Sequence, residues 1–319
     1  MSDKMIQTPS IAIGTWAWGD SGTKGEGYFG SQLTQENLQA VTDNAIKNGF
    51  TLWDTAAVYG MGHSETVLGT MLEKYDRSEY QLSTKFTPQI ADNSDNPVET
   101  MLNASLKRLK TDYIDIYWIH NPADVEKWTP YIIPLLENGK IKHVGVSNHN
   151  IDQIKLADSI LNKAGYRVEA VQNHFSLLYR SSEEAGVLDY CKEHNIKFFA
   201  YMVLEQGALT GRYNQDNPLP AGSDRAAIYN QLLPQLESLT DKMKAMGEAQ
   251  NVSTADIATA WAIAKGTTPI LGVTKPKYID DEVQVNKIKL SNEDIKTLEK
   301  LADAANVDTR GGWEQPMDK

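Results

Sequence analysis

Four side chains of kinds that can pass a proton to a carbonyl oxygen occur at intervals along the first half of the sequence. Asp54, Lys85 and His120 each end a short β-rich run, and Tyr59 follows the first of these runs. The carboxyl ends of parallel strands meet at one edge of a sheet, so we expect the four groups to converge there. Singly they have ordinary explanations: a turn former, a solvated charge, a hydrogen-bonded histidine and a packed aromatic ring. Their coincidence on consecutive strand ends favours an active site.

The chemistry that these four groups suit is the reduction of a carbonyl group. A phenol with a pKa of about 10 is a weak acid at neutral pH. An ammonium nearby stabilises the phenolate, so we expect Lys85 to lower the pKa of Tyr59 and Asp54 to keep Lys85 charged. His120 can donate a hydrogen bond to the substrate oxygen and polarise the carbonyl. A proton on oxygen completes a reduction only if the carbon receives a hydride, so a nicotinamide cofactor is required.

The elements that must position these groups alternate between strand and helix. Eight β-rich runs occur at 11–16, 50–54, 80–85, 113–120, 142–147, 168–173, 196–202 and 268–273. Between them, Asn96, Asn150 and Ser253 have the positions of helix N-caps, and Gly49 that of a helix stop. This alternation predicts parallel strands throughout and an α/β fold, a (β/α)8 TIM barrel.

Two segments exceed the minimal plan of such a barrel. One is a long loop insertion after strand seven, about 205–251, with a helix near 229–249, and the other is an extra C-terminal helix at 291–304 followed by a polar tail. Long loops at the catalytic face of a barrel usually shape a pocket. Because nothing resembles an interdomain linker, we expect one barrel domain over residues 1–319.

The stretch GEGYFG, 25–30, matches the dinucleotide-binding pattern G-x-G-x-x-G. In a Rossmann unit this motif directly follows the first strand and opens the next helix, whose N-terminus meets the pyrophosphate. Here the first strand ends near Trp16, the helix begins at about Thr34, and Glu26 adds a negative charge. Asp54 at the end of the second strand is the one point in favour. We therefore interpret the stretch as a flexible loop over one end of the barrel.

Composition excludes several classes of function. The 319 residues have a net charge of −11 with scattered Lys and Arg, so a nucleic-acid partner is not expected. No apolar run reaches the length of a membrane span, and the N-terminus does not read as a signal peptide, which favours the cytoplasm and no membrane partner. Cys191 is alone and fits a buried helix face, and the six histidines show no zinc-site pairing, so no metal is expected. The sequence predicts no particular oligomeric state.

Motifs around the four candidate residues resemble the aldo-keto reductases. They are DTAAVYGMGHSE (54–65), STK (83–85), WIH (118–120), GVSN (145–148) and AYMVLEQGALTGRY (200–213), and the match runs from GTWAWGD (14–20) to GVTKP (272–276). The resemblance implies NAD(P)H-dependent reduction of aldehydes or ketones on a TIM barrel without a Rossmann domain. It makes Tyr59 the proton donor, Lys85 and Asp54 its tuning pair, and His120 the carbonyl-orienting residue.

The resemblance also implies a site for NADPH, with NADH as the alternative. Its residues would be Thr15, Trp16, Asp54, Ser147, Asn148, Gln172, Tyr201, Met202, Leu204, Gln206, Gly207, Leu209, Gly211, Arg212, Gly272, Thr274, Lys275, Tyr278, Asp281 and Glu282. Tyr201 would stack on the nicotinamide ring. The chain departs from the family pattern at Tyr278, where an arginine often grips the 2′-phosphate, which leaves Lys275 and Lys277 as the cations there. It also has Asp281 and Glu282 in place of the usual Glu-Asn on the adenine.

Aromatic residues at strand ends and loops predict the substrate pocket. These are Trp16, Trp18, Phe86, Trp118 and Trp128. A pocket of this kind favours an apolar or aromatic aldehyde or ketone as the small-molecule substrate.

Two other functions remain open at this point. A lysine at a barrel strand end can form a Schiff base with a carbonyl substrate, as in a lyase, although Asp54 would keep Lys85 protonated and non-nucleophilic. A cofactor-binding regulatory subunit of the same fold is the second alternative, and the complete quartet does not indicate a loss of catalysis.

Overall fold

The computed structural model describes residues 6–20, 28–30 and 32–318. Within this part of the chain, eight parallel strands close into a barrel in chain order, with β8 against β1. The strands are β1 Ala12–Gly14, β2 Leu52–Asp54, β3 Gln81–Phe86, β4 Ile114–Ile119, β5 Ile141–Ser147, β6 Ala170–His174, β7 Lys197–Tyr201 and β8 Thr268–Gly272. Each overlaps one predicted β-rich run, and the predicted (β/α)8 TIM barrel is confirmed.

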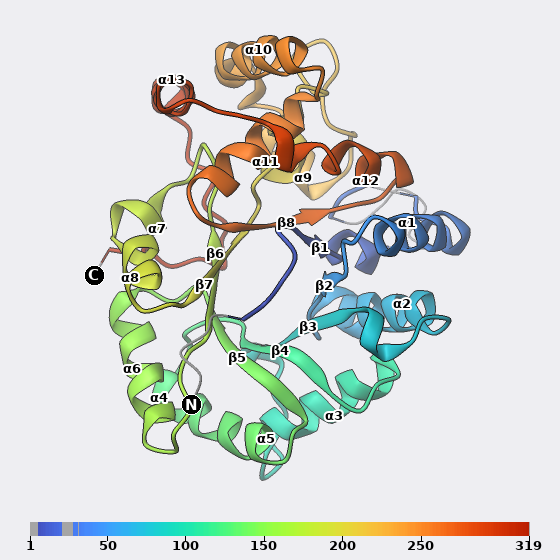
Figure 1. Cartoon of the computed structure of the whole chain (residues 1–319), viewed down its shortest axis with the longest axis vertical. Helices are drawn as coiled ribbons and strands as arrows, with labels where there is room; N and C mark the ends of the chain where they lie inside the picture. The colour runs from blue at the N-terminus through green and yellow to red at the C-terminus, as the bar shows by residue number, and fades with distance from the viewer. Residues whose placement is uncertain (1–5, 21–27, 31, 319) are drawn as a thin grey trace.

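Helices surround the ring of strands (Figure 1). They are α1 Gln35–Lys47, α2 His63–Leu72, α3 Pro97–Leu109, α4 Val125–Trp128, α5 Ile133–Glu137, α6 Ile151–Asn162, α7 Ser181–Glu184, α8 Val187–Glu193, α9 Asp224–Tyr229, α10 Leu233–Gln250, α11 Thr254–Ala264, α12 Pro276–Glu282 and α13 Asn292–Ala305. The predicted caps are confirmed, since Asn96, Asn150 and Ser253 each accept a backbone N–H of the first helical turn. Gly49, at φ +81°, follows α1 and gives the left-handed conformation that stops it.

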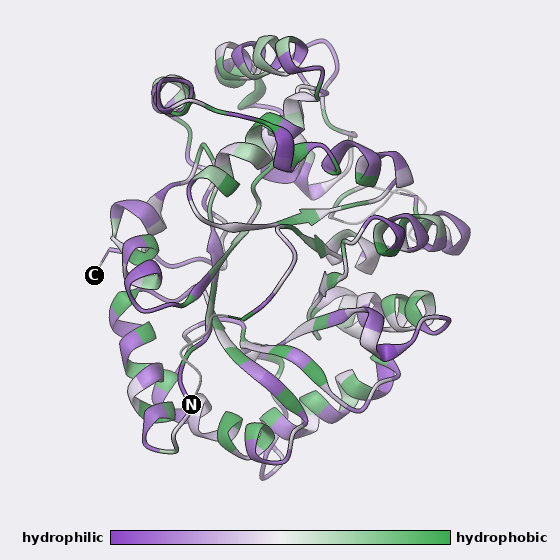
Figure 2. Cartoon of the chain, viewed as in Figure 1, coloured by the Kyte–Doolittle hydropathy of each residue, from purple (hydrophilic) through white to green (hydrophobic). Residues whose placement is uncertain are grey.

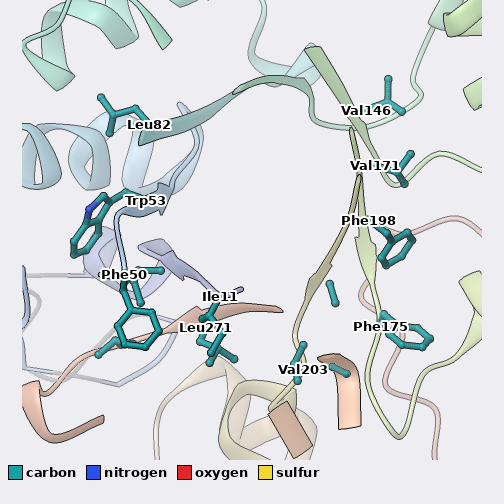
Figure 3. Packing of buried hydrophobic residues seen from close by; sticks show 14 of the residues in the cluster. Ile11, Phe50, Trp53, Leu82, Val146, Val171, Phe175, Phe198, Val203 and Leu271 are labelled. Carbon is teal, nitrogen blue, oxygen red and sulfur yellow. The ribbon is translucent and has the colours of Figure 1, made fainter. Parts of the chain in front are cut away.

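The alternation of side chains along the strands produces two apolar layers. The larger one fills the space between the strands and the helices, and Figure 3 shows Trp53, Leu82, Val171 and Phe198 on the outer side of the ring. A smaller cluster packs inside the barrel and includes Ala12, Leu52, Ile116, Trp118, Ala170, Phe199 and Ile270. In Figure 2 the hydrophobic colour accordingly gathers on the strands and on the helix faces turned toward them. The barrel interior is therefore packed, and the polar groups are left to its rim.

The insertion after β7 contains two helices, α9 and α10, where the sequence predicts one. Pro234 lies in the first turn of α10, a position where the missing proline N–H costs nothing. A separate apolar cluster under these helices includes Tyr229, Leu236 and Ala305, so the insertion packs against the end of α13. The predicted C-terminal helix is α13, and we call residues 306–318, which follow it, the tail.

The loop predicted around GEGYFG lies partly outside the described residues, which omit 21–27. Tyr28 and Phe29 are described, and they contact the ring of Trp16 at centroid distances of 4.6 and 5.1 Å. A closed barrel has no Rossmann crevice, so the rejection of this motif as a dinucleotide fingerprint agrees with the fold. Among the helices of the described residues, none combines the length and the apolarity that a bilayer crossing requires.

Candidate active site

A buried ion pair joins the ends of β2 and β3. Lys85 Nζ lies 2.6 Å from Asp54 Oδ2 and also donates to the carbonyl oxygen of Thr55 at 2.7 Å. The other carboxylate oxygen of Asp54 accepts from Ser83 Oγ at 2.6 Å and from Gln172 Nε2 at 3.2 Å. Strand register places Asp54 beside Ser83 on neighbouring strands, which brings the two charges within reach. Since burial of a charge is costly unless it is paired and hydrogen-bonded, this saturation explains why the pair can exist.

Tyr59 lies beside this pair, in the turn that follows β2. Lys85 Nζ is 5.1 Å from the centroid of the Tyr59 ring, and the ring centroids of Tyr59 and His120 are 6.0 Å apart. The turn is fixed by close contact between two glycines, because a Cβ on Gly60 (φ +55°) would approach Gly19 O to 2.7 Å. The structure thus brings the predicted quartet together at one rim.

The sequence motif around Tyr59 also supplies the groups that hold its loop. Ser64 Oγ donates to the backbone oxygen of Thr15 at 2.7 Å, which ties the start of α2 to the end of β1. Glu65 is fully buried and accepts from Thr84 and from Arg108, both at 2.6 Å. These bonds connect α2 to β3 and α3, so the S-E pair of the motif is structural support for Tyr59.

The predicted lowering of the Tyr59 pKa is not found in this structure, where other influences outweigh the ammonium of Lys85. Burial, followed by the negative charge of Asp54, raises the pKa of Tyr59 well above its usual value. Lys85 has its charge balanced by Asp54 at short range, and burial lowers the pKa of Lys85 itself. Tyr59 therefore stays protonated at neutral pH, and it can release its proton only to an oxygen that gains negative charge.

His120 is held as a neutral imidazole. Burial, together with the charge of Lys85, lowers the pKa of His120 well below 6.5. Its Nδ1 lies 2.8 Å from the Thr87 hydroxyl, a partner that the strand-end pattern did not indicate. A neutral ring whose Nδ1 accepts from Thr87 carries its proton on Nε2, which can then donate to a carbonyl oxygen.

The residues predicted to hold the nicotinamide lie next to the quartet. Asn148, at φ +62°, donates from Nδ2 to the backbone oxygen of His120 at 3.0 Å and accepts from the Tyr201 hydroxyl at 2.6 Å. Ser147 ends β5, and Gln172 reaches Asp54 from β6. Polar amide and hydroxyl groups are thus gathered at the rim formed by β5, β6 and β7, where they suit a carboxamide.

The segment after β7 has a backbone suited to an anionic group. Gln206 (φ +54°) and Gly207 (φ +110°) turn the chain sharply. Arg225, which the sequence pattern did not indicate, is partly buried beside them. Its Nη1 donates to the backbone oxygen of Gln206 at 2.8 Å, and its Nε has no partner among the described residues. A guanidinium with one N–H still free beside a tight turn is a fit for a pyrophosphate.

The predicted cofactor residues in the segment after β7 differ in their surroundings. Met202, Leu204, Gly211 and Arg212 lie in the same segment, whereas Leu209 is fully buried in the core. Arg212 Nη1 donates to the Tyr278 hydroxyl at 2.6 Å, which brings the segment to the start of α12. The side chain of Leu209 therefore packs in the core, and its part in cofactor binding stays a prediction.

The predicted adenosine end lies between the end of β8 and the start of α12. Gly272, Thr274 and Lys275 connect the two elements, and a Cβ on Gly272 would meet no atom within 4 Å. Glu282 is buried in α12, and burial together with the charges of Asp256 and Asp281 raises its pKa well above the usual value. A neutral carboxyl group of this kind can donate as well as accept, as the amide of asparagine does.

Of the aromatic residues predicted to line a substrate pocket, Trp16 makes a ring contact with the quartet. Its ring stacks on Tyr59 with centroids 5.9 Å apart. The others are corrected to packing residues, since their side chains are buried in the two apolar layers: Trp18, Phe86, Trp118 and Trp128. Phe86 alternates outward on β3 and packs on Trp128, and Trp118 plugs the barrel interior, where its Nε1 donates to Ser83 Oγ at 2.6 Å.

A further group at this rim was not predicted. His174 ends β6 and contacts Glu205, after β7, and Glu314 in the tail. The strand-end position of His174 was a signal comparable to that of His120, but nothing in the sequence connects a strand end to Glu314, 140 residues away. Within the described residues, no group of His, Cys, Asp and Glu side chains is arranged to hold a metal ion.

Comparisons with known proteins indicate the family. The model of the aldo/keto reductase family matches residues 10–303. An aldo-keto reductase of Schizosaccharomyces pombe named for NADP(+) is 32% identical over 294 residues, covering 86% of this chain and 85% of that protein. A chloroplastic pyridoxal reductase of Arabidopsis thaliana is 29% identical over 313 residues, covering 93% and 84%.

Solved structures share the fold. A glycerol dehydrogenase from Gluconobacter oxydans superposes with a TM-score of 0.79 at 24% identity, over 96% of this chain and 97% of that one. An aldo-keto reductase from Klebsiella pneumoniae, solved in complex with NADPH, gives a TM-score of 0.73 at 22% identity over the full length of both chains. The family match over nearly the whole sequence, on a barrel with this rim, shows that the chain belongs to the aldo/keto reductase family.

Proposed function

We propose that this protein is an oxidoreductase that uses NADPH to reduce aldehydes or ketones to alcohols, as a single barrel domain in the cytoplasm. The observation that carries the proposal is the convergence of Tyr59, the Lys85–Asp54 ion pair and His120 at one rim. The naming of the fission-yeast relative for NADP(+) supports this choice of cofactor. NADH is the alternative, because Tyr278 occupies the position of the usual phosphate-binding arginine.

The roles of the quartet follow from their protonation states. The bound cofactor supplies the hydride that the carbonyl carbon receives. His120 donates from Nε2 to the carbonyl oxygen and polarises the bond. As this oxygen gains negative charge, Tyr59 gives it the phenolic proton, and the ammonium of Lys85 stabilises the phenolate that remains. Asp54 keeps Lys85 charged and oriented.

The polar residues around the quartet would hold the cofactor along the rim. Ser147, Asn148 and Gln172 suit the carboxamide, and Tyr201 offers a ring face to the nicotinamide. The turn at 204–212 and the adjoining Arg225 suit the pyrophosphate. Lys275 and Lys277, before and within α12, are the cations available for the 2′-phosphate.

The side chains around Trp16 favour an apolar or aromatic substrate. Its ring contacts Tyr28 and Phe29, and Trp313 of the tail meets it edge-on at a centroid distance of 5.6 Å. Trp313 was not among the predicted pocket residues, because its position at the rim depends on the path of the tail. Such a set of rings offers an apolar wall and edge-to-face contacts to a flat carbonyl compound.

The test is the consumption of NADPH, followed by its absorbance, across aldehydes, ketones, sugars and quinones, and repeated with NADH. We expect turnover of aromatic and apolar carbonyl compounds, with NADPH preferred. Turnover of only small charged sugars or phosphates would contradict the substrate class. Tight NADPH binding without turnover of any compound would instead support a regulatory subunit.

The Schiff-base alternative gains no support from the site. The ammonium of Lys85 donates to Asp54 and to the Thr55 carbonyl, and in this protonated form it has no lone pair with which to attack a substrate carbon. Borohydride treatment in the presence of a carbonyl substrate should leave Lys85 unmodified. A trapped adduct on this residue, identified by mass spectrometry, would reinstate the lyase.

A further inference from the structure

A second buried charge cluster lies beside the quartet, centred on His174. Its Nε2 is 2.9 Å from Glu205 Oε1 and its Nδ1 is 3.0 Å from Glu314 Oε1, and each of the three side chains is at most 1% exposed. Because a carboxylate oxygen accepts at both ring nitrogens, both must carry a proton. Burial opposes that charge, but the two carboxylates outweigh it and raise the pKa of His174 to about 9. We call these three residues the His174 clamp.

The clamp fixes three segments that are far apart in the sequence. Glu205, in the turn after β7, also accepts from Ser176, from Tyr229 at 2.6 Å and from Thr309 of the tail at 3.0 Å. Its own backbone has φ +46°, a conformation that costs free energy for a residue with a Cβ. The turn persists because these donors and His174 hold the carboxylate. Glu314 then connects the tail to the end of β6.

The clamp also determines the setting of Tyr201. Glu314 Oε1 is 2.9 Å from the Tyr201 hydroxyl and Asn148 Oδ1 is 2.6 Å from it, so the two acceptors share the single phenolic proton. The Tyr201 ring stacks on His174 with centroids 5.5 Å apart, and the His174 ring also stacks on Tyr179 at 4.3 Å. One face of Tyr201 is therefore covered, and a nicotinamide ring would have to use the other.

We propose that Glu314 is a positioning residue of the nicotinamide site, which sets the Tyr201 ring through the His174 clamp and holds the tail across the ends of β6 and β7. The inference rests on the proposed function, because Tyr201 matters only if a nicotinamide binds there. It also explains the position of Trp313. This residue directly precedes Glu314 in the chain, and its ring contacts Trp16 at the rim.

The test compares Glu314→Gln with Asp318→Asn, which removes one negative charge from the exposed end of the same tail. Affinity is measured by quenching of tryptophan fluorescence with two probes, NADPH and 2′-phospho-ADP-ribose, which lacks the nicotinamide. We expect Glu314→Gln to weaken NADPH binding about 10-fold, the effect of losing a charged hydrogen bond, and to leave the second probe unchanged. Glu314→Asp, which keeps the charge, should restore part of the loss and serves in its place if Glu314→Gln does not fold.

Limited trypsin digestion reports on the tail independently of any cofactor. Arg310 is exposed in the tail, and cleavage after it releases 311–319. We expect faster release from Glu314→Gln than from the wild type or Asp318→Asn. Equal NADPH affinity in both variants overturns the positioning role, as does an equal loss for both probes, which would indicate a general defect. A wild type that binds no NADPH overturns the proposed function, and the two failures are thereby distinguished.

Discussion

Two buried cations lie at the same rim of the barrel and are neutralised differently. Lys85 has one carboxylate partner, Asp54, and burial lowers its pKa. His174 lies between two carboxylates, Glu205 and Glu314, which raise its pKa to about 9 in spite of burial. The number of carboxylates in contact, rather than the depth of burial, separates the two. A cation with one carboxylate partner can still act electrostatically on other groups nearby. A cation with two carboxylate partners serves instead as a structural link.

The two sites also differ in how the chain assembles them. The Lys85 pair joins neighbouring strands, so the register of β2, β3 and β4 suffices to bring the groups together. The His174 clamp needs the insertion turn and the tail in place as well, with Glu314 arriving from beyond the last helix. The first site is therefore a property of the barrel, and the second is a property of what this chain adds to the barrel.

The largest expected effect tests whether the site around Lys85 is catalytic. Tyr59→Phe removes only the proton donor, so turnover should fall about 10²- to 10⁴-fold, while NADPH affinity changes little. Steady-state rates and fluorescence titration measure the two quantities. Tyr131→Phe, which removes a hydroxyl outside the quartet, is the control. Near-normal turnover of Tyr59→Phe would mean that another group is the acid.

The next largest effect is the loss of stability expected when the Lys85–Asp54 ion pair is broken. Lys85→Met leaves the carboxylate of Asp54 buried without its counter-charge, and the free energy of unfolding should fall by about 3–5 kcal/mol. Lys74→Met breaks an exposed pair with Asp43, whose side chains are 50% and 43% accessible, and should cost about 0–1 kcal/mol. Urea unfolding of both variants provides the comparison. Equal losses would show that burial does not distinguish the two pairs.

The two-carboxylate cation should give the protein a pH dependence of its own. The pKa of His174 is raised from 6.5 to about 9, and the titratable groups facing its ring are Glu205, Glu314, Tyr179 and Tyr201. Because the folded-state value is the higher one, the stabilisation is fully present below about pH 6.5 and is lost as the pH rises through about 9.

Urea unfolding across this range of pH measures the effect. Relative to the variant His174→Gln, the wild type should lose on the order of 3 kcal/mol of unfolding free energy between these limits. Glu314→Gln, which retains the histidine with one carboxylate, should show a smaller slope than the wild type. Parallel curves for all three proteins would contradict the clamp as a charged link.

The smallest effect concerns an exposed cation remote from both sites. Lys275 precedes α12 and has no buried partner, so its contribution to binding comes from the ligand alone. Lys275→Ala should weaken NADPH about 10-fold and leave NADH nearly unchanged, as measured by fluorescence titration. Equal losses for both cofactors would show that Lys275 does not recognise the 2′-phosphate.

The sequence was informative where local pattern and strand register decide the outcome. The positions of Asp54, Lys85 and His120 at strand ends predicted their meeting, because parallel strands align their carboxyl ends. It was misleading for Phe86 and Trp18, since a residue near the end of a strand can alternate outward into the layer under the helices. The pKa of Tyr59 was also mispredicted, because burial and the charge of Asp54 depend on distances that spacing in the chain does not give.

The amino-acid sequence by itself determined the alternation of strands and helices, the caps that begin the helices, and the four groups at the ends of β2, β3 and β4. These features depend on periodicity and on neighbours a few residues apart. The regular closure of the barrel then aligns the strand ends around a ring. Only the tertiary structure decided that Glu314 bonds His174 and Tyr201, that Arg225 lies beside the turn at Gln206, and that Trp313 reaches Trp16. Such contacts depend on the path of irregular segments through space, which packing sets and periodicity does not.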